Sequence, residues 1–458
     1  MVNQKWGVVD LDAGNLLVRG SLDHEQILNE DWSVDAGIDL VGANSSNYGK
    51  AWVQQIYGRA NWKIWRLDIG SREDYTSSLN PRLSSGDFSK SNNARPIPEI
   101  KGSIPNFIQI PYTKGNMYIK GDIAVGYYLD SQWKEDLARP HNQDYTTKLL
   151  SHHKSVSFRF GEIETKNRMQ FTVEMDHVAV WGGNLYKYEA KQEKYGINHQ
   201  PHSITEFLRM AIAKEGSSSA SGGDQIYVAG SQWGSYLFKY DYKLKNEDQL
   251  SLYIHHFFDD GSGMTFENYR DNMLGLEYKA KKKSGLSGAV FEYVYTKQQT
   301  GPIHFNTGMD DEHRDRLISK GNGNDNYYNN FFYIQGPSYF GKTIGTPLLL
   351  SPEYNRDGSL NFKSSRIIAF HIGLEGYFHP AFQYRLLFTS GQSWGRYNIP
   401  FTAVKEGFAS QLELIYACPQ VTGLALKLAA GYDQGEFFGG DTFGGGLTVS
   451  KQGVFYFK

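Results

Sequence analysis

The sequence predicts an all-β protein, a transmembrane antiparallel β-barrel of the outer-membrane type, and three observations support this prediction. Apolar residues alternate with polar or small ones along most of the chain, long polar connections alternate with short ones, and the polar strand positions carry charges of both signs. The mean hydropathy is −0.52, and no apolar run approaches the ~20 residues that a helical membrane span needs. The 458 residues contain no linker-like run, so we expect one domain, residues 1–458.

Residues 249–279 show the alternation most clearly. The apolar positions are Leu250, Leu252, Ile254, Leu274 and Leu276, and the positions between them include Ser251, Tyr253, His255, Gly275 and Glu277. A period of two residues is that of a β-strand, so this stretch predicts two neighbouring strands. The polar connection 259–271 is too long for a tight hairpin, whereas the next connection, 281–287, is shorter. This combination is typical of membrane barrels, whose long loops are extracellular.

The N-terminal third contains strand-like stretches at 32–40 and 65–69, followed by a Ser-, Asn- and Pro-rich segment at 73–110. Pro96 and Pro98 cannot donate a hydrogen bond to a central strand ladder. We therefore expect this segment to lie over the sheet, inside the barrel or at an edge.

The middle of the chain has strand-like stretches at 117–127, 156–160 and 171–180, and it contains one convincing helix. Ser203 and Glu206 form a capping box at the start of this helix, which we place at residues 203–214 and which has one apolar stripe. A stripe of this kind needs a surface to cover. We therefore expect the helix to cap or plug the lumen as a packing element, with partner binding as the alternative.

The second half repeats the alternation, and the whole chain gives roughly sixteen to eighteen plausible strands. Further strand-like stretches lie at 236–242, 289–295, 368–374, 382–388, 412–416, 424–428 and 447–449. The long connections fall on one side of the barrel, which we take as extracellular; they are 73–92, 130–154, 185–234, 259–271, 300–362, 391–408 and 435–444.

The strand positions opposite the apolar ones are rich in charge, and we expect them to face a polar lumen. They include Asp35, Asp39, Arg66, Asp68, Lys120, Asp122, Arg159, Glu174, Lys239, Asp241, Lys243, Glu277, Lys279, Glu292, Glu375, Arg385, Glu413, Lys427 and Asp433. Burying unpaired charges in a dry sandwich is costly, whereas a wide lumen accommodates them. Both signs occur in comparable numbers, which favours a cross-braced, occluded lumen over an ion-selective pore. A large soluble all-β protein with one wet face is the alternative.

Charge and motifs narrow the function classes further. The net charge of −2 and the scattered basic residues argue against nucleic-acid binding, and the single Cys418 excludes an internal disulfide or a multi-cysteine metal site. His255 and His256 point to opposite faces of a strand, so they cannot jointly chelate a metal. No G-x-S-x-G motif is present, and we expect no enzymatic activity, no metal and no cofactor. Because MVNQKWG lacks the pattern of a signal peptide, we expect that an export signal has been removed.

Several segments resemble the Wzi-type capsule assembly family of outer-membrane barrels, in its Bacteroidetes-like branch. They are SNNARPIPEI (91–100), GSYLFKYDY (234–242), YIHHFFDDGSGM (253–264), MLGLEY (273–278), EYVYTKQQTGP (292–302) and DNYYNNFFYIQGPSYFGKTIGTPLL (325–349). The resemblance implies a monomeric, occluded barrel of about 18 strands with long extracellular loops. The sequence enters strand-like residues almost at once, without the helical bundle at the periplasmic end of the enterobacterial relatives, and we therefore expect the plug to be the helix at 203–213 or the Pro-rich segment.

The resemblance also implies a location and a function. It implies a multi-pass protein of the bacterial outer membrane with loops exposed at the cell surface. There it would act as a lectin that binds capsular or other exopolysaccharide and supports its attachment or assembly, without catalysis. The expected partners are surface polysaccharide, outer-membrane lipid and lipopolysaccharide, and a surface lipoprotein is a further candidate.

Candidate glycan-binding residues lie in the predicted loops and at strand ends. Aromatic faces cover the apolar sides of sugar rings, while carboxylates and amides bind the hydroxyls. The candidates are Trp233, His256, Asp259, Asp260, Asp325, Tyr327, Tyr328, Asn329 and Trp394. Packing or membrane-interface girdles are the alternative for the aromatic residues, and hydrogen bonds within the loops are the alternative for the polar ones. Two other functions stay open: a passive oligosaccharide porin, and a lipolytic barrel enzyme that uses His255 or His256.

Overall fold

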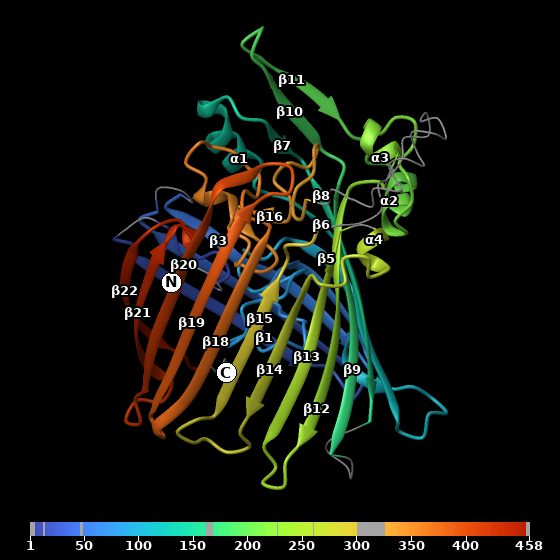
Figure 1. Ribbon diagram of the computed structural model, residues 1–458. Helices are drawn as coiled ribbons and strands as arrows, with labels where there is room; N and C mark the ends of the chain where they lie inside the picture. Colours follow the sequence, from blue (N-terminus) through green and yellow to red (C-terminus); the bar gives the residue numbers. More distant parts are fainter. Residues whose placement is uncertain are drawn as a thin grey trace.

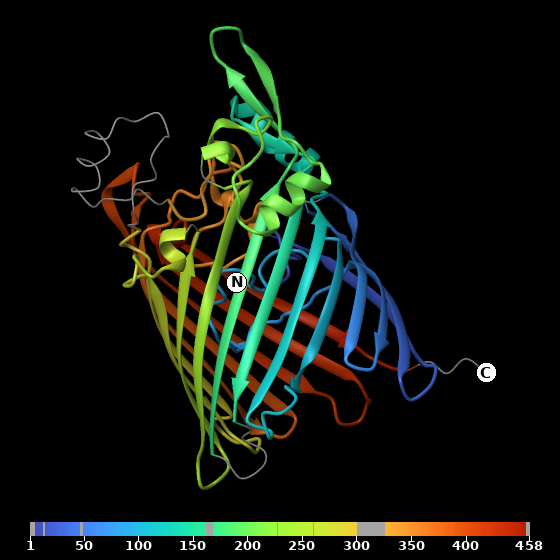
Figure 2. The same cartoon turned by 90° about the vertical axis from the view of Figure 1, so that its right-hand side faces the viewer.

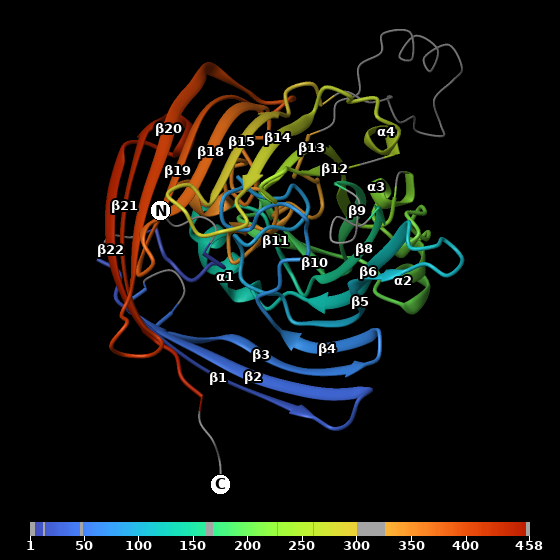
Figure 3. The same ribbon diagram turned by 90° about the horizontal axis from the view of Figure 1, so that it is seen from below.

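The computed structural model describes residues 5–11, 14–45, 49–161, 168–226, 228–259, 261–299 and 326–454. Seventeen strands of these residues form one antiparallel sheet, which curves round a central lumen (Figure 1; Figure 3). The strands are β1 Leu17–Ile27, β2 Trp32–Ala43, β3 Ala51–Trp62, β4 Trp65–Ser71, β5 Glu99–Gln109, β6 Met117–Tyr127, β8 Leu150–Phe160, β9 Met169–Trp181, β12 Ser231–Lys243, β13 Gln249–Phe258, β14 Asn272–Lys279, β15 Gly288–Tyr295, β18 Ile367–His379, β19 Phe382–Gly395, β20 Pro400–Ala417, β21 Leu424–Gly435 and β22 Thr442–Lys451. This architecture confirms the predicted barrel class, with one strand fewer than eighteen in the described residues.

The two faces of the strands divide as the alternation predicts. On β13 and β14, the side chains of Leu252 and Leu276 point outward and are 58% and 45% exposed, whereas Tyr253 and Glu277 point inward and are buried. The same parity places most of the predicted lumen charges inside. The outer surface is therefore an apolar band, and the inner surface is polar.

The remaining elements lie mainly at one end of the barrel, where the long connections gather (Figure 1; Figure 2). They are the helices α1 Ser131–Ala138, α2 Ile204–Ala211, α3 Gly222–Ile226 and α4 Gly261–Met264, the short strands β7 Tyr145–Thr147, β10 Asn184–Glu189, β11 Lys194–His199, β16 Ser338–Tyr339 and β17 Lys342–Thr343, and the 3-10 helices Arg139–His141, Pro352–Tyr354 and Glu436–Phe438. In the described part of the chain, every helix is too short or too polar to cross a membrane.

One predicted long connection is wrong. Residues 391–408 mostly belong to β19 and β20, which are joined by residues 396–399 alone. Their polar side chains, such as Gln392 and Glu406, hydrogen-bond to each other across the two strands. Strands that continue beyond the apolar band do not need an apolar face, so their sequence resembles that of a loop.

A plug, formed by residues 5–11, 73–98 and 326–362, occupies the lumen (Figure 3). Its buried aromatic side chains, which include Phe88, Tyr328 and Phe362, share one apolar core with the inward residues Trp233 and Phe257 of the wall. Backbone hydrogen bonds join its parts, because the Ser91 amide donates to the Ile344 carbonyl and the Trp6 amide to the Asn92 carbonyl. The sequence predicts that the Pro-rich segment 73–110 lies over the sheet, inside the barrel or at an edge. Its first part, residues 73–98, lies inside the barrel, and residues 99–109 form the wall strand β5.

The predicted helix exists and lies in the long connection between β9 and β12 at the extracellular end, as one of the two expected loop positions, but it does not enter the lumen. Helix α2 begins after Ser203, whose hydroxyl accepts a hydrogen bond from the Glu206 amide, and it ends at Ala211 rather than at residue 214. It packs against the outer face of the wall, where Phe207 and Met210 contact Trp181. Phe207 and Met210 therefore cover the outside of the barrel, and the lumen is left to the plug.

Candidate functional site

Carboxylates on the inner wall hold the plug through hydrogen bonds. Glu292 of β15 accepts bonds from the Ser84 hydroxyl at 2.6 Å and from the Ser85 amide at 2.7 Å, and the Tyr253 hydroxyl donates to the same carboxylate at 2.6 Å. Further along the wall, Glu174 of β9 accepts bonds from the amide and the hydroxyl of Ser78. The charged lumen is thus cross-braced through the plug.

Further wall residues repeat this arrangement around the barrel. Glu277 accepts a bond from the Asn80 side chain, Glu375 pairs with Arg82, and Glu413 pairs with Lys5 and Arg385. Lys239 bridges Glu277 and the Ser78 carbonyl at 2.8 and 2.9 Å. Because so many wall charges have plug partners, the plug is an integral part of the lumen.

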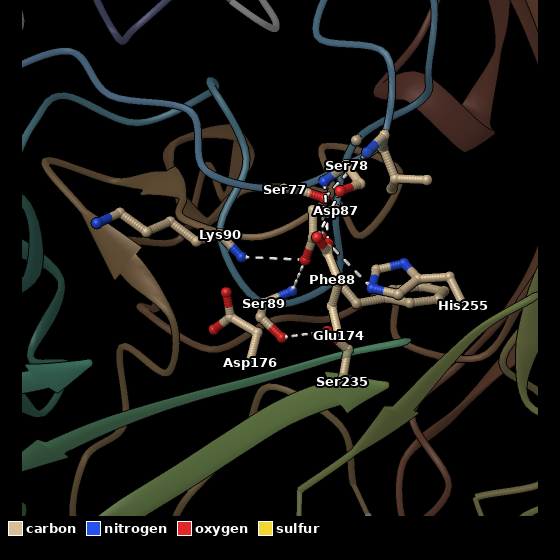
Figure 4. A network of polar contacts seen from close by, with 12 residues as sticks. Ser77, Ser78, Asp87, Phe88, Ser89, Lys90, Glu174, Asp176, Ser235 and His255 are labelled. Atoms are coloured by element: carbon tan, nitrogen blue, oxygen red, sulfur yellow. Dashed lines mark hydrogen bonds and ion pairs between the residues drawn. The ribbon is translucent and has the colours of Figure 1, made fainter. Parts of the chain in front are cut away.

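Asp87 lies at the centre of the network that Figure 4 shows. It accepts hydrogen bonds from the Ser77 hydroxyl and the Ser89 amide, both at 2.7 Å, and its carboxylate lies 3.4 Å from Nε2 of His255. The ring of His255 stacks on Phe88 with a centroid distance of 5.0 Å. A cavity of about 10 Å³ between these residues and Glu174 has room for about one water molecule and not for a sugar ring.

Three candidate glycan-binding residues lie inside the shared core. Trp233, Tyr327 and Tyr328 are 2%, 0% and 3% exposed. The Trp233 indole donates to the Ser89 carbonyl, and the hydroxyls of Tyr327 and Tyr328 donate to Asp271 and to the Phe88 carbonyl. The packing alternative therefore describes these three rings, because no ring face is open to a sugar.

The other candidates are dispersed over the extracellular end. His256 points outward on β13, where it contacts the Asn272 side chain of β14 and the Gly263 carbonyl of α4. Asn329 braces the plug through two hydrogen bonds with the backbone of Phe362, and Asp259 is half-buried at the upper end of β13. Trp394 lies on the outer face of β19 beside Lys297, on the part of the strand that continues beyond the apolar band. Asp260 and Asp325 lie outside the described residues.

Sequence reasoning missed an aromatic surface above the rim, which we call the tyrosine face. The strands β7, β10 and β11 form a small sheet that projects beyond the barrel (Figure 1). One face of this sheet consists of Tyr145, Tyr186, Tyr188 and Tyr195. The rings of Tyr145 and Tyr186 stack at 4.7 Å with an angle of 4° between their planes, and Tyr195 contacts both Tyr145 and Tyr188 at 5.4 Å.

Polar groups surround and fix the tyrosine face. The Arg139 guanidinium lies 5.4 Å from the centroid of the Tyr195 ring, and the Tyr195 hydroxyl donates to the Gln143 carbonyl at 3.1 Å. Asn184 and His199 form a side-chain hydrogen bond of 2.6 Å at the base of the face. Tyr145 is 1% exposed and belongs to the shared core, so it supports the face from below. Tyr186, Tyr188 and Tyr195 are half-buried, so their rings are held in place and still reach the surface.

In the loop that follows β13, Asp271 links three segments at the extracellular end. It accepts hydrogen bonds from the amides of Gln298 and Gln299 and from the Tyr327 hydroxyl, at 2.7 to 2.9 Å. Burial raises the pKa of Asp271 to about 6 from an ordinary value of 3.8, although these bonds act in the opposite direction.

A pH-dependent change in stability should follow from this carboxyl group. The folded state binds the proton more tightly than the unfolded state, so the stabilisation is complete below pH 3.8 and is lost as the pH rises through about 6. We expect the contribution of Asp271 to the free energy of unfolding to fall by up to about 3 kcal/mol over this pH range. Hydrogen exchange of residues 265–271 should therefore be slower at pH 5 than at pH 7 after correction for intrinsic rates. Asp271→Asn should abolish the difference, and a pH dependence that survives in this variant would contradict the assignment.

Among the described residues, no group of three or more His, Cys, Asp and Glu side chains is arranged to hold a metal ion. The prediction that the protein uses no metal or cofactor stays a prediction.

Comparison with known proteins identifies the fold of this chain. No protein-family model and no curated protein matches the sequence. Among solved structures, the chain is similar to Wzi of Escherichia coli, an outer membrane protein involved in group 1 capsule assembly and described as a carbohydrate-binding β-barrel. The TM-score is 0.53 at 11% identity, over 95% of this chain and 83% of that chain. OccK5 (OpdH) of Pseudomonas aeruginosa matches with a TM-score of 0.45 at 8% identity, over 95% and 94% of the two chains. The likeness to Wzi shows the architecture, and this chain therefore has the fold of the bacterial outer-membrane β-barrels.

Proposed function

We propose that this protein is a surface lectin of the outer membrane, which binds capsular or other exopolysaccharide and supports its attachment or assembly at the cell surface. The observation that carries the proposal is the tyrosine face. It offers preorganised aromatic rings beside Arg139, Asn184 and His199 at the extracellular end of the barrel. Aromatic faces and planar polar groups are the two kinds of surface that sugars need. The likeness to Wzi, a carbohydrate-binding barrel, is consistent with this function.

The plug argues against the alternative, a passive oligosaccharide porin. Ion pairs and hydrogen bonds join it to the wall at Glu174, Glu277, Glu292, Glu375 and Glu413. An oligosaccharide would have to displace these contacts, and the cavity beside Asp87 is too small for a sugar ring. On this basis the barrel anchors a binding surface, and the lumen serves as its support.

Glycan-array binding by the detergent-purified protein tests the proposal directly. We expect binding to extracted capsular polysaccharide, and we expect that a deletion strain loses surface-attached polysaccharide. A strain that retains normal capsule after deletion would contradict the proposal.

Planar bilayers test the alternative function independently. We expect no steady ionic current from the purified protein, with an open porin as the positive control. A steady conductance would favour the porin and would contradict an occluded lumen.

A further inference from the structure

The outer face of the wall is unexpectedly polar near the extracellular ends of β8, β9 and β12. His152 and Lys154 share the outward parity of β8 with Phe160, which is 40% exposed. His177 occupies the corresponding face of β9, and Gln232 that of β12. Polar side chains on a lipid-facing strand surface are costly, so this patch needs a cover.

Helix α2 provides the cover. The ammonium group of Lys154 donates to the Ala211 carbonyl at the C-terminal end of the helix, a position that also suits the helix dipole. Gln232 donates to the carbonyls of Met210 and Ala229 at 3.1 and 2.9 Å, and it contacts His177 at 3.0 Å. The Phe207 ring meets His152 edge to face at 5.5 Å. Met210 is fully buried, so the inner side of α2 is packed against the wall.

The outer side of α2 is apolar and uncovered. Ile204, Leu208 and Ile212 follow one another at intervals of four residues, and they are 78%, 57% and 71% exposed. The interval places them in one stripe along the helix and its C-terminal cap, on the side away from Phe207 and Met210. Figure 2 shows α2 on the outer wall beside the rim.

The stripe continues the apolar band of the barrel. On β6, the strand that pairs with β8, the outward side chains Ile123 and Val125 are 54% and 36% exposed, and Leu129 beyond its end is 60% exposed. Helix α2 therefore replaces a polar section of the outer wall by an apolar one at the height where the band ends. An amphipathic helix in this position matches the interface between acyl chains and headgroups.

We propose that α2 is an in-plane membrane helix, and that Ile204, Leu208 and Ile212 bind the acyl chains of the outer leaflet. The helix seals the polar patch of β8, β9 and β12 from lipid on one side and extends the lipid-contacting surface on the other. Lipid is the expected neighbour of this stripe, because the stripe continues the apolar band of the barrel. The test below distinguishes lipid from a covering protein and from water.

Spin labels at single cysteines test the proposal in reconstituted phospholipid vesicles. The protein carries Cys418→Ser, so that a label attaches only at Leu208→Cys, at Leu252→Cys on the lipid-facing wall, or at Asn198→Cys on the projecting hairpin. We expect the ratio of oxygen to nickel-chelate collision rates at position 208 to lie within about twofold of that at position 252, and several-fold above that at position 198.

Two outcomes would overturn the proposal. A ratio at position 208 like that at position 198 would place the stripe in water, and exclusion of both reagents would mean that protein covers it. Ile204→Cys and Ile212→Cys repeat the measurement if the label at position 208 disturbs folding. The spin-label measurement does not depend on polysaccharide binding. A result against the membrane helix would therefore leave the proposed lectin function untouched.

Discussion

Replacement of Glu292 by alanine is expected to loosen the plug while the barrel wall stays folded. The carboxylate is fully buried and accepts hydrogen bonds from Ser84, Ser85 and Tyr253. Its removal leaves three buried donors without their acceptor, and each unsatisfied group costs about 1–3 kcal/mol. Allowing for relaxation, we expect a loss of about 3–5 kcal/mol in the local stability of the plug. The strand ladders of β15 do not depend on this side chain.

Hydrogen exchange at residues 84–90 measures this effect. A loss of about 3 kcal/mol corresponds to roughly 150-fold faster exchange in that segment, if exchange is limited by local opening. The control is Glu406→Ala, which removes a carboxylate from an exposed pair with Gln392 on β19 and β20. Exchange at residues 84–90 should stay unchanged in the control. Equal protection in both variants would show that Glu292 does not anchor the plug.

The direction of the lumen side chains could be predicted from the sequence, but their partners could not. The two-residue period places Glu174, Glu277 and Glu292 on the inner face, because each follows the parity of its strand. Their partners lie in the Ser-rich segment 77–85, which is 208 residues from Glu292 in the case of Ser84. No local pattern encodes a contact over that distance, so the sequence predicts a cross-braced lumen and offers the Pro-rich segment as a candidate plug, but it does not identify the pairs of side chains that brace it.

Helix α2 shows a different limit of the periodic pattern. Its capping box correctly predicts where the helix begins, because the cap is a local interaction. The pattern groups Ile204, Phe207 and Leu208 on one apolar face, whereas the structure separates Phe207 from the other two. An apolar stripe predicts only that the helix packs against something apolar. The barrel wall, the plugged lumen and a lipid layer are all apolar neighbours of this kind, so the pattern does not choose among them.

Residue type alone also fails to separate sugar-binding aromatic rings from packed ones. Trp233 and Tyr327 have the chemistry of a lectin site, yet their burial assigns them to the core. The tyrosine face lies in the connections 130–154 and 185–234, for which the sequence predicts long extracellular connections and one helix. The alternation of Tyr186 and Tyr188, followed by Tyr195, is a signal for a short hairpin, but Tyr145 joins it only through pairing with a distant segment.

Replacement of Tyr188 by alanine is expected to weaken polysaccharide binding by about 30-fold, which corresponds to the loss of about 2 kcal/mol at an aromatic contact in the binding site. Tyr188 contacts Tyr195, and the hydrogen bond that fixes its strand uses its backbone amide and Asp144, so the hairpin should persist in the variant. Lys187→Ala is the matched control, because Lys187 is exposed on the opposite face of the same strand. Binding of extracted capsular polysaccharide to both variants, measured by titration of the detergent-purified proteins, separates a ring contact from a general effect of the hairpin. If Tyr188→Ala binds as tightly as the unaltered protein, the tyrosine face is not the glycan site, whereas equal losses in both variants would point to the hairpin as a whole.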